Sequence, residues 1–287
     1  MPSIALFFDL FKLRIGLVIG FTAIAGLAVQ PGSLPGWKAA VLGLSVVLAS
    51  AAAGAFNQYV ERDLDARMRR TRARPFVTGR LEHGPFWLVV IALLLVNSVA
   101  ATAAAVNPLS AFFVFLGAFF YGVVYTVWLK RRTWWNIVIG GLAGSFAVLA
   151  GATAVSPAEV GGSAGALALV LFLWTPPHFW SLAIACREDY QAAGVPMLPV
   201  VVGDAKAARA VLAGTVTLVA ASFLPLAFGM GWIYLMGATL GGVLFLRTSL
   251  ALARNPGRKA AMANFHASLA QLTLVLTTAM IDARLAG

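Results

Sequence analysis

Two long stretches of the chain carry no formal charge. Residues 83–129, with His83 neutral, and residues 210–246 contain no Asp, Glu, Lys or Arg. As one helix, the first stretch would be roughly 70 Å long at about 1.5 Å per residue, more than twice the thickness of a hydrocarbon core. Each stretch therefore holds two membrane-spanning helices. The first is expected to break at 107–108, an Asn-Pro pair, and the second at 229–231, Gly-Met-Gly.

The apolar segments predict an all-α, polytopic membrane protein. They are continuous rather than alternating, which favours helices over a β-barrel, because the amides of a lipid-embedded helix bond within their own segment. Nine transmembrane helices are expected, at 15–29, 38–59, 85–105, 109–129, 135–155, 163–185, 208–228, 231–249 and 263–282. No soluble appendage interrupts them, so residues 1–287 are expected to form one membrane domain. The basic residues and apolar run at the N-terminus vaguely resemble a signal peptide, but we interpret this segment as a retained first helix.

Charge placement predicts the orientation. With the N-terminus inside, the loops at 60–84, 130–134, 186–207 and 250–262, the N-terminal segment and the adjoining span ends collect 19 of the 21 Lys and Arg residues on the cytoplasmic side. The C-terminus is then external. Seven of the ten acidic residues lie in the same loops, so we expect chemistry on the cytoplasmic face. The net charge of +11 reflects these loops, and no soluble basic domain exists to bind nucleic acid.

The most polar segment, 57–75, holds three carboxylates and six arginines. Asn57, Glu61 and Asp65 are four residues apart, so a helix would place them within about 80° of one another, with Asp63 on the other side. Their oxygen ligands suit Mg²⁺, which usually takes one or two carboxylates and completes its shell with water and phosphate. Orientation does not require these carboxylates, and polar groups that continue a membrane helix usually mark a site. The arginines either hold phosphate or only fix the loop inside the cell.

A second polar group follows the expected sixth span. Thr175-Pro176-Pro177-His178 lies within that span, where His178 is either a hydrogen-bonded core residue or a catalytic one. Glu188 and Asp189 follow it on the same membrane side as the first group. Two acidic sites on one face could hold two cations around one diphosphate. The connector at 125–133, with Lys130 and Arg131, either sets topology or binds phosphate. The single Cys186 excludes an internal disulfide and a thiol metal site.

These segments together resemble the UbiA superfamily of intramembrane prenyltransferases, and within it the haem O synthase branch. The matching segments lie at 57–75, 125–133, 136–141, 174–180, 187–190 and 194–199, and weaker similarity is present at 11–14 and 265–272. Four features depart from the pattern. Glu61 stands where an aspartate is usual, Cys186 and Tyr190 fall near the acidic positions of the second motif, Leu13 replaces a proline, and 145–149 replaces a proline-rich segment.

The resemblance implies a reaction and a set of roles. A farnesyl group would pass from farnesyl diphosphate to a vinyl group of protohaem IX, with water added, to give haem O. The implied catalytic residues are Asn57, Glu61, Asp65 and Asp189, and the implied Mg²⁺ ligands are Glu61, Asp65, Glu188 and Asp189. The implied diphosphate contacts are Arg62, Arg70, Lys130 and Arg131. The implied acceptor region includes His178 and Tyr125. The implied location is the bacterial cytoplasmic membrane with the site facing the cytoplasm, and a haem A synthase is a candidate partner.

Three alternatives remain at this stage. A UbiA-type enzyme could prenylate another acceptor, such as a quinone-precursor ring or a chlorin. A transporter with a midplane ion site would also use polar groups and prolines within spans, but the carboxylates lie at one interface and no inverted repeat is visible. A phosphatidyl-alcohol transferase would also use metal-bound carboxylates, but its spaced signature is absent from the chain.

Overall fold

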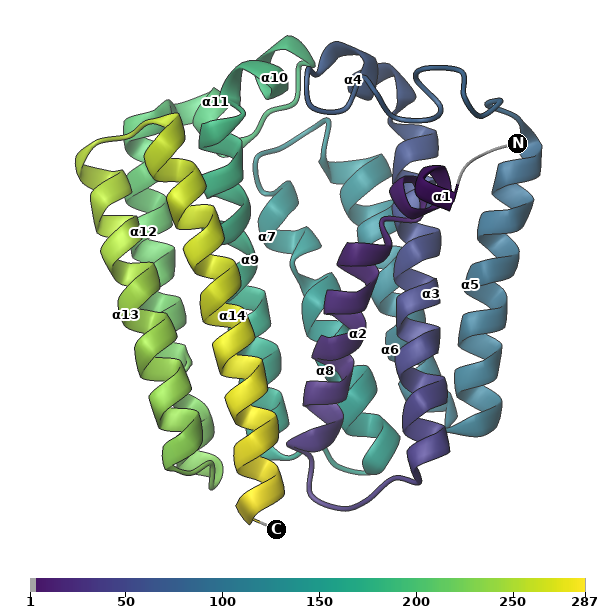
Figure 1. Cartoon of the computed structure of the whole chain (residues 1–287), viewed down its shortest axis with the longest axis vertical. Coiled ribbons are helices and arrows are strands. Elements are labelled where there is room, and N and C mark those ends of the chain that lie inside the picture. Colours follow the sequence, from purple (N-terminus) through teal and green to yellow (C-terminus); the bar gives the residue numbers. More distant parts are fainter. Residues whose placement is uncertain (1–3, 287) are drawn as a thin grey trace.

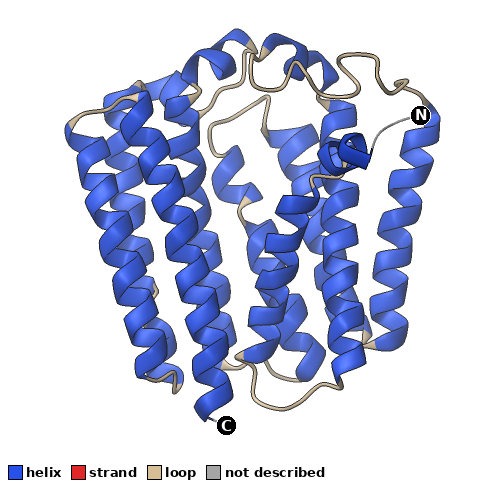
Figure 2. Ribbon diagram, viewed as in Figure 1, coloured by secondary structure: helices blue, strands red, loops and turns tan. Residues whose placement is uncertain are grey.

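Helices make up all the regular structure of residues 4–286, which are the residues that this computed structural model describes (Figure 1). Figure 2 shows no strand among them. The longer helices are α2 (Leu13–Ala28), α3 (Gly36–Val60), α5 (Pro85–Ala105), α6 (Pro108–Phe119) continued by the π-helix η1 (Phe120–Leu129), α8 (Leu142–Val155), α9 (Gly162–Ala185), α12 (Asp204–Ala221), α13 (Trp232–Arg254) and α14 (Arg258–Ala286). The shorter ones are α1 (Ile4–Leu10), α4 (Arg62–Arg67), α7 (Asn136–Gly140), α10 (Arg187–Ala192), α11 (Leu198–Val202) and the 3-10 helix η2 (Leu224–Phe228).

The long helices have the length and composition of membrane spans. Among the described residues, seven segments are apolar enough and long enough to cross a membrane, counting α6 with η1, α7 with α8, and α12 with η2 as single segments. The apolar α2 is shorter, with 16 residues, and α14 lies outside these seven. The protein is therefore an all-α integral membrane protein. The expected count of nine crossings stays a prediction.

The two ends of the helix bundle differ. The short helices α1, α4, α10 and α11 all lie at the upper end in Figure 1, whereas α14 ends at the lower end. An apolar cluster packs α4, α10 and α11 onto the ends of α9 and α12; among its buried members are Leu64, Ile184, Tyr190, Leu198 and Ala208. The upper connectors are therefore packed into the fold and give fixed positions to the polar residues that they carry.

Two glycines allow α2 and α8 to approach backbone to backbone. A Cβ atom on Gly26 would lie 2.2 Å from the carbonyl oxygen of Val148, and one on Gly151 would lie 1.9 Å from that of Ala23. Neither site can hold a larger residue without separating the helices. Small residues at such crossings are a common way of packing membrane helices, and this one ties the N-terminal helix into the middle of the bundle.

Two spans depart from simple α-helices. The expected span at 109–129 changes from α-helix to π-helix at Phe120. The span at 135–155 is divided at Gly141, between α7 and α8. The span at 163–185 is one continuous helix, since α9 continues through Pro176 and Pro177.

Candidate active site at the upper end of the bundle

Three buried polar side chains form a line from α3 into α4. Asn57 lies in the last turn of α3, Glu61 directly follows that helix, and Asp65 lies in α4. They are 2%, 1% and 2% exposed, respectively. The Asp63 side chain, by contrast, is 52% exposed. The four-residue spacing thus gives this segment an inward face with an amide and two carboxylates, and an outward face with a third carboxylate.

Two cations neutralise the two buried carboxylates, one from a distant segment and one from the same polar segment. Lys130 Nζ lies 2.6 Å from Glu61 Oε2, and Arg74 Nη1 lies 2.6 Å from Asp65 Oδ2. The other oxygen of Glu61, Oε1, is buried and has no hydrogen-bond partner in the described part of the chain. An acceptor left in this state costs free energy unless a water, an ion or a ligand fills the position. Glu61 therefore offers one free ligand oxygen.

A lysine from the N-terminal segment holds Asn57. Lys12 Nζ donates to Asn57 Oδ1 at 2.6 Å and to the Tyr121 hydroxyl at 3.0 Å. The amide Nδ2 of Asn57 donates to Thr126 Oγ1 at 3.1 Å. Both ends of the amide are therefore engaged, and its orientation follows from the donors and acceptors around it.

The backbone of Lys12 has an unusual conformation. Its φ of 47° and ψ of 42° are left-handed, and it is the one residue other than glycine with positive φ among residues 4–286. Such a conformation costs about 1 kcal/mol and in folded proteins clusters at functional sites. Gly54 makes room for the side chain, since a Cβ there would lie 3.3 Å from Lys12 Cδ. In the sequence, Lys12 is one of the basic residues that predict membrane orientation, and the weak resemblance at 11–14 is its only other signal.

The π-helix η1 supplies the wall opposite α3. Its hydrogen bonds span five residues, as from the Lys130 N–H to the Tyr125 carbonyl at 2.9 Å. The pairs Thr126–Asn57 and Lys130–Glu61 have the same sequence separation of 69 residues, so η1 and α3 run parallel here. Tyr125 lies beside this line, with Lys130 Nζ 5.5 Å from its ring centre. Its role in acceptor binding stays a prediction.

The second acidic pair lies on the α10 connector and contacts the loop after α4. Asp189 Oδ1 accepts from the Arg69 N–H at 3.3 Å and from Arg69 Nε at 3.4 Å, and Oδ2 accepts from the Arg70 N–H at 3.2 Å. Glu188, 83% exposed, forms an ion pair with Arg69. Within residues 4–286, no group of three or more His, Cys, Asp or Glu side chains is placed to hold a metal ion. The four expected metal carboxylates are thus not gathered, and the metal role of Glu188 and Asp189 stays a prediction.

The four expected diphosphate contacts have different surroundings. Lys130 is 8% exposed and lies in the site, whereas Arg62 is exposed. Arg131 forms two hydrogen bonds with the outward-facing Asp63, at 2.7 and 2.8 Å. This pairing raises the pKa of Arg131 and lowers the pKa of Asp63. Arg131 is therefore engaged outside the site.

Arg70 is exposed at the mouth of the site. Its guanidinium makes no ion pair in the described residues, although its backbone N–H is held by Asp189. Burial lowers the pKa of Arg70, but Tyr190, Cys186, Tyr125 and Asp65 around it raise that pKa by more. An unpaired guanidinium beside these groups is available to an anion.

His178 lies in an aromatic stack between α9 and α14. Its ring centre is 4.0 Å from that of Trp174 and 4.4 Å from that of Phe265, with both rings stacked on it. His178 Nδ1 is 2.6 Å from Ser268 Oγ. These contacts are those of a packed, hydrogen-bonded core residue, which was one of the two interpretations of this histidine. Its acceptor role stays a prediction.

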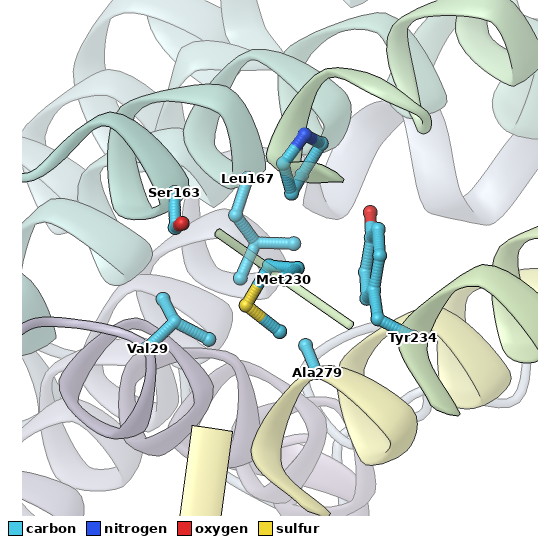
Figure 3. A pocket seen from close by; sticks show the side chains of 7 residues that line it. Val29, Ser163, Leu167, Met230, Tyr234 and Ala279 are labelled. Atoms are coloured by element: carbon cyan, nitrogen blue, oxygen red, sulfur yellow. The ribbon is translucent and has the colours of Figure 1, made fainter. Parts of the chain in front are cut away.

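Two cavities differ in size and place. One of about 270 Å³ lies between α3, α5, α6 and η1 and is lined by apolar side chains, among them Phe56, Ile91, Leu95, Phe119 and Val123. Phe56 is the residue directly before Asn57 in α3. The other, at the lower end, is lined by the side chains in Figure 3 and leaves no room for a water molecule. Only the first is therefore large enough and close enough to serve the polar site.

Comparison with known proteins identifies relatives over nearly the whole chain. The model of the UbiA prenyltransferase family matches residues 19–269. Protoheme IX farnesyltransferase 2 of Paramagnetospirillum magneticum is 57% identical over 280 residues and covers 97% of both chains. Protoheme IX farnesyltransferase 1 of the same organism is 46% identical over 96% of this chain and 97% of its own. The protoheme IX farnesyltransferase of Hahella chejuensis is 39% identical, over 96% and 92%.

Solved structures show the same fold at lower identity. A structure of digeranylgeranylglyceryl phosphate synthase has a TM-score of 0.79 and 18% identity, and covers 99% of both chains. A UbiA homolog from Archaeoglobus fulgidus, bound to DMAPP and Mg²⁺, has a TM-score of 0.67 and 18% identity, over 94% of this chain and 98% of its own. Together with the family match, these likenesses mean that the chain belongs to the UbiA prenyltransferase family.

Proposed function

We propose that this chain transfers a farnesyl group from farnesyl diphosphate to a vinyl group of protohaem IX, giving haem O. In this reaction the bond between the farnesyl C1 and the diphosphate oxygen breaks, and C1 bonds to the outer vinyl carbon. Water adds as hydroxyl to the inner vinyl carbon and loses one proton, and diphosphate leaves. The relatives at 39–57% identity over nearly the full chain support this assignment. The single structural observation that carries it is the buried line of Asn57, Glu61 and Asp65 among cations.

The donor set fits a magnesium ion. Glu61 and Asp65 supply only carboxylate oxygen atoms to a cation, and Glu61 Oε1 is buried without a partner in the described residues. Two carboxylates are the usual protein share for Mg²⁺ bound with a phosphate substrate. We propose that these residues hold Mg²⁺. When bound, the ion would act as a Lewis acid that offsets the charge on the departing diphosphate.

The side chains around this line suit a diphosphate. Lys12, Arg70, Arg74 and Lys130 bring four positive charges, while Glu61 and Asp65 bring two negative ones, so the formal sum is +2. An anion therefore gains from entering this site even before a metal is counted. Lys12 and Asn57 are already joined at 2.6 Å, and we propose that this pair orients one phosphate group.

The apolar cavity of about 270 Å³ suits the farnesyl chain. It begins at Phe56, one residue from Asn57, and continues between α3, α5 and η1, where Leu88, Phe115 and Val123 are exposed on the outside of the bundle. A prenyl chain placed here would keep its diphosphate at the polar line and its tail near lipid. The aromatic side chains of the cavity would stabilise an allylic cation, and its apolar lining would keep water from reacting with that cation too early.

We further propose the placement in the membrane. Nine helices would cross it, with the N-terminus and the polar site on the cytoplasmic side of the bacterial inner membrane and the C-terminus outside. The support is the gathering of Lys and Arg in the loops of one side. Residues 1–287 would act as one domain, and a haem A synthase that oxidises the product is a candidate partner.

One experiment tests the proposed reaction and its alternatives. Purified protein is incubated with protohaem, farnesyl diphosphate and Mg²⁺, and the pigment is analysed by mass spectrometry. We expect the mass of one farnesyl group plus one hydroxyl to be added, and no addition with the Asp65→Asn variant or without divalent cations. If protohaem gains no mass but a quinone-precursor ring or a chlorin is prenylated, protohaem is rejected as the acceptor and prenyl transfer is retained as the reaction.

A further inference from the structure

The Asp189 carboxylate binds main chain rather than a cation site. Its two oxygens accept hydrogen bonds from the N–H groups of two consecutive residues, Arg69 at 3.3 Å and Arg70 at 3.2 Å. The Arg69 side chain adds a third donor at 3.4 Å. A carboxylate that takes two adjacent amides fixes the peptide between them, because both distances and both directions must be met together.

The loop on either side of this peptide is also held. Met68 is 2% exposed and lies in the apolar cluster with Leu64 and Tyr190. Thr71, 3% exposed, donates from Oγ1 to the carbonyl oxygen of Asp65 at 3.2 Å. Between these two anchors, the only hydrogen bonds and ion pairs of residues 69 and 70 with α10 in the described chain are those with Glu188 and Asp189. The acidic pair is therefore the polar link between residues 69–70 and α10, beside the apolar packing of Met68.

The three arginines of the held loop have different surroundings. Arg69 turns outward to the exposed Glu188, with a side chain 69% exposed. Arg74 reaches Asp65. The exposed Arg70 guanidinium makes no ion pair in the described residues, so it is available to an anion.

We propose that Asp189 is a positioning residue that fixes the loop 68–74 so that Arg70 faces the diphosphate, and that it is not a ligand of the metal. At Asp189, Oδ1 already accepts from two donors and Oδ2 from one, so a metal would compete with these donors for the carboxylate oxygens. The other carboxylate of this segment, Glu188, is 83% exposed and paired with Arg69. This inference rests on the proposed function, since Arg70 is given a diphosphate to bind.

The first test is structural and needs no turnover. Hydrogen exchange is measured on the substrate-free protein in detergent micelles, for peptides that cover residues 66–80. For Asp189→Ala we expect the amides of residues 69 and 70 to exchange about tenfold faster, because their acceptor is gone. Glu188→Ala is the matched control, since it removes only an exposed ion pair, and exchange should then stay as in the wild type. Equal exchange in Asp189→Ala and wild type would overturn the proposal.

The second test separates positioning from metal binding. We expect Asp189→Ala to raise the KM for farnesyl diphosphate about tenfold, the effect of one lost charge-assisted contact, with the half-saturating Mg²⁺ concentration unchanged. Arg70→Gln should give the same rise, and the double variant should be no worse than either alone. Asp189→Asn keeps one acceptor oxygen, so its KM for farnesyl diphosphate should lie between those of the wild type and Asp189→Ala. This variant also serves as the test if Asp189→Ala does not fold.

The outcomes are distinguishable. A raised Mg²⁺ requirement in Asp189→Ala, with amide exchange at 69–70 unchanged, would reject the positioning role and favour a metal ligand. Additive effects of Asp189→Ala and Arg70→Gln would also reject it. If the wild type does not farnesylate protohaem, the proposed function fails, but the exchange experiment still decides whether Asp189 holds the loop.

Discussion

The two ends of the bundle bury carboxylates in different ways. At the upper end, Glu61 and Asp65 are paired with the side-chain cations of Lys130 and Arg74. At the lower end, Asp282 of α14 is 4% exposed and has main-chain partners instead.

The partners of Asp282 are the amides at the start of α13. It accepts hydrogen bonds from the N–H groups of Gly231, Ile233 at 3.1 Å and Tyr234 at 3.3 Å. These donors point out of a helix N-terminus, which also favours a negative charge through its dipole. They cannot move away without unwinding the helix. Asp282 is therefore a fixed cap that joins α13 to α14.

The difference shows how to tell a structural carboxylate from a chemical one. Main-chain donors occupy Asp282 permanently. Lysine and arginine side chains can rotate toward an incoming anion, and Glu61 keeps one oxygen without a partner in the described residues. Burial alone does not separate these residues, since their exposed fractions are similar. The kind of partner does.

The largest expected effect comes from removing a charge at the upper end. Asp65→Asn should lower kcat/KM for farnesyl diphosphate by about a thousandfold, because the variant loses a carboxylate that would hold the Mg²⁺ offsetting the charge of the departing diphosphate. The measurement is product formation at saturating Mg²⁺ with protein of verified folding. Asp63→Asn is the control: this carboxylate is 52% exposed, so activity should change by about twofold or less. A near wild-type rate for Asp65→Asn would remove it from the site.

A smaller effect should separate the contribution of the Glu61–Lys130 ion pair to stability from its contribution to activity. Lys130→Met leaves a buried carboxylate unpaired and should lower the free energy of unfolding by about 3 kcal/mol. In Lys130→Met combined with Glu61→Gln, that loss should be mostly recovered, because no charge remains buried, while activity stays low. Unfolding in mixed micelles and product assays measure the two quantities. If the double variant regained activity, Glu61 and Lys130 would be a structural pair like Asp282 and its amides.

Much of the fold was predictable because long apolar segments in lipid have few alternatives to helices. Asn107 and Pro108 marked a helix break that the structure shows between α5 and α6. The change to a π-helix at Phe120 was not predictable. It depends on hydrogen bonds made after η1 meets α3, such as that from Asn57 to Thr126, and the local residues give no sign of it.

In the candidate site, the residues that follow from local spacing could be predicted from the sequence, whereas those defined by tertiary contacts could not. Asn57, Glu61 and Asp65 follow from helical periodicity alone. Lys12 could not be assigned, because its left-handed backbone and its contact with Asn57 join segments 45 residues apart. The metal role of Asp189 stays a prediction; its hydrogen bonds to the N–H groups of Arg69 and Arg70 join segments about 120 residues apart, which the sequence does not show.

The smallest expected effect tests the structural end of the comparison. Asp282→Ala should lower the free energy of unfolding by about 1–2 kcal/mol, as for loss of a helix N-cap, because three amides at the start of α13 lose their acceptor. The KM and kcat of the folded protein should stay within about twofold of wild type, since stability effects of distant sites are usually independent. Thermal unfolding in detergent and the farnesyl transfer assay measure the two. Asp282→Asn, which keeps one acceptor oxygen, should lose about half as much stability. If Asp282→Ala lowered kcat at unchanged stability, the lower end would not be merely structural, and the kind of partner would no longer separate the two carboxylate classes.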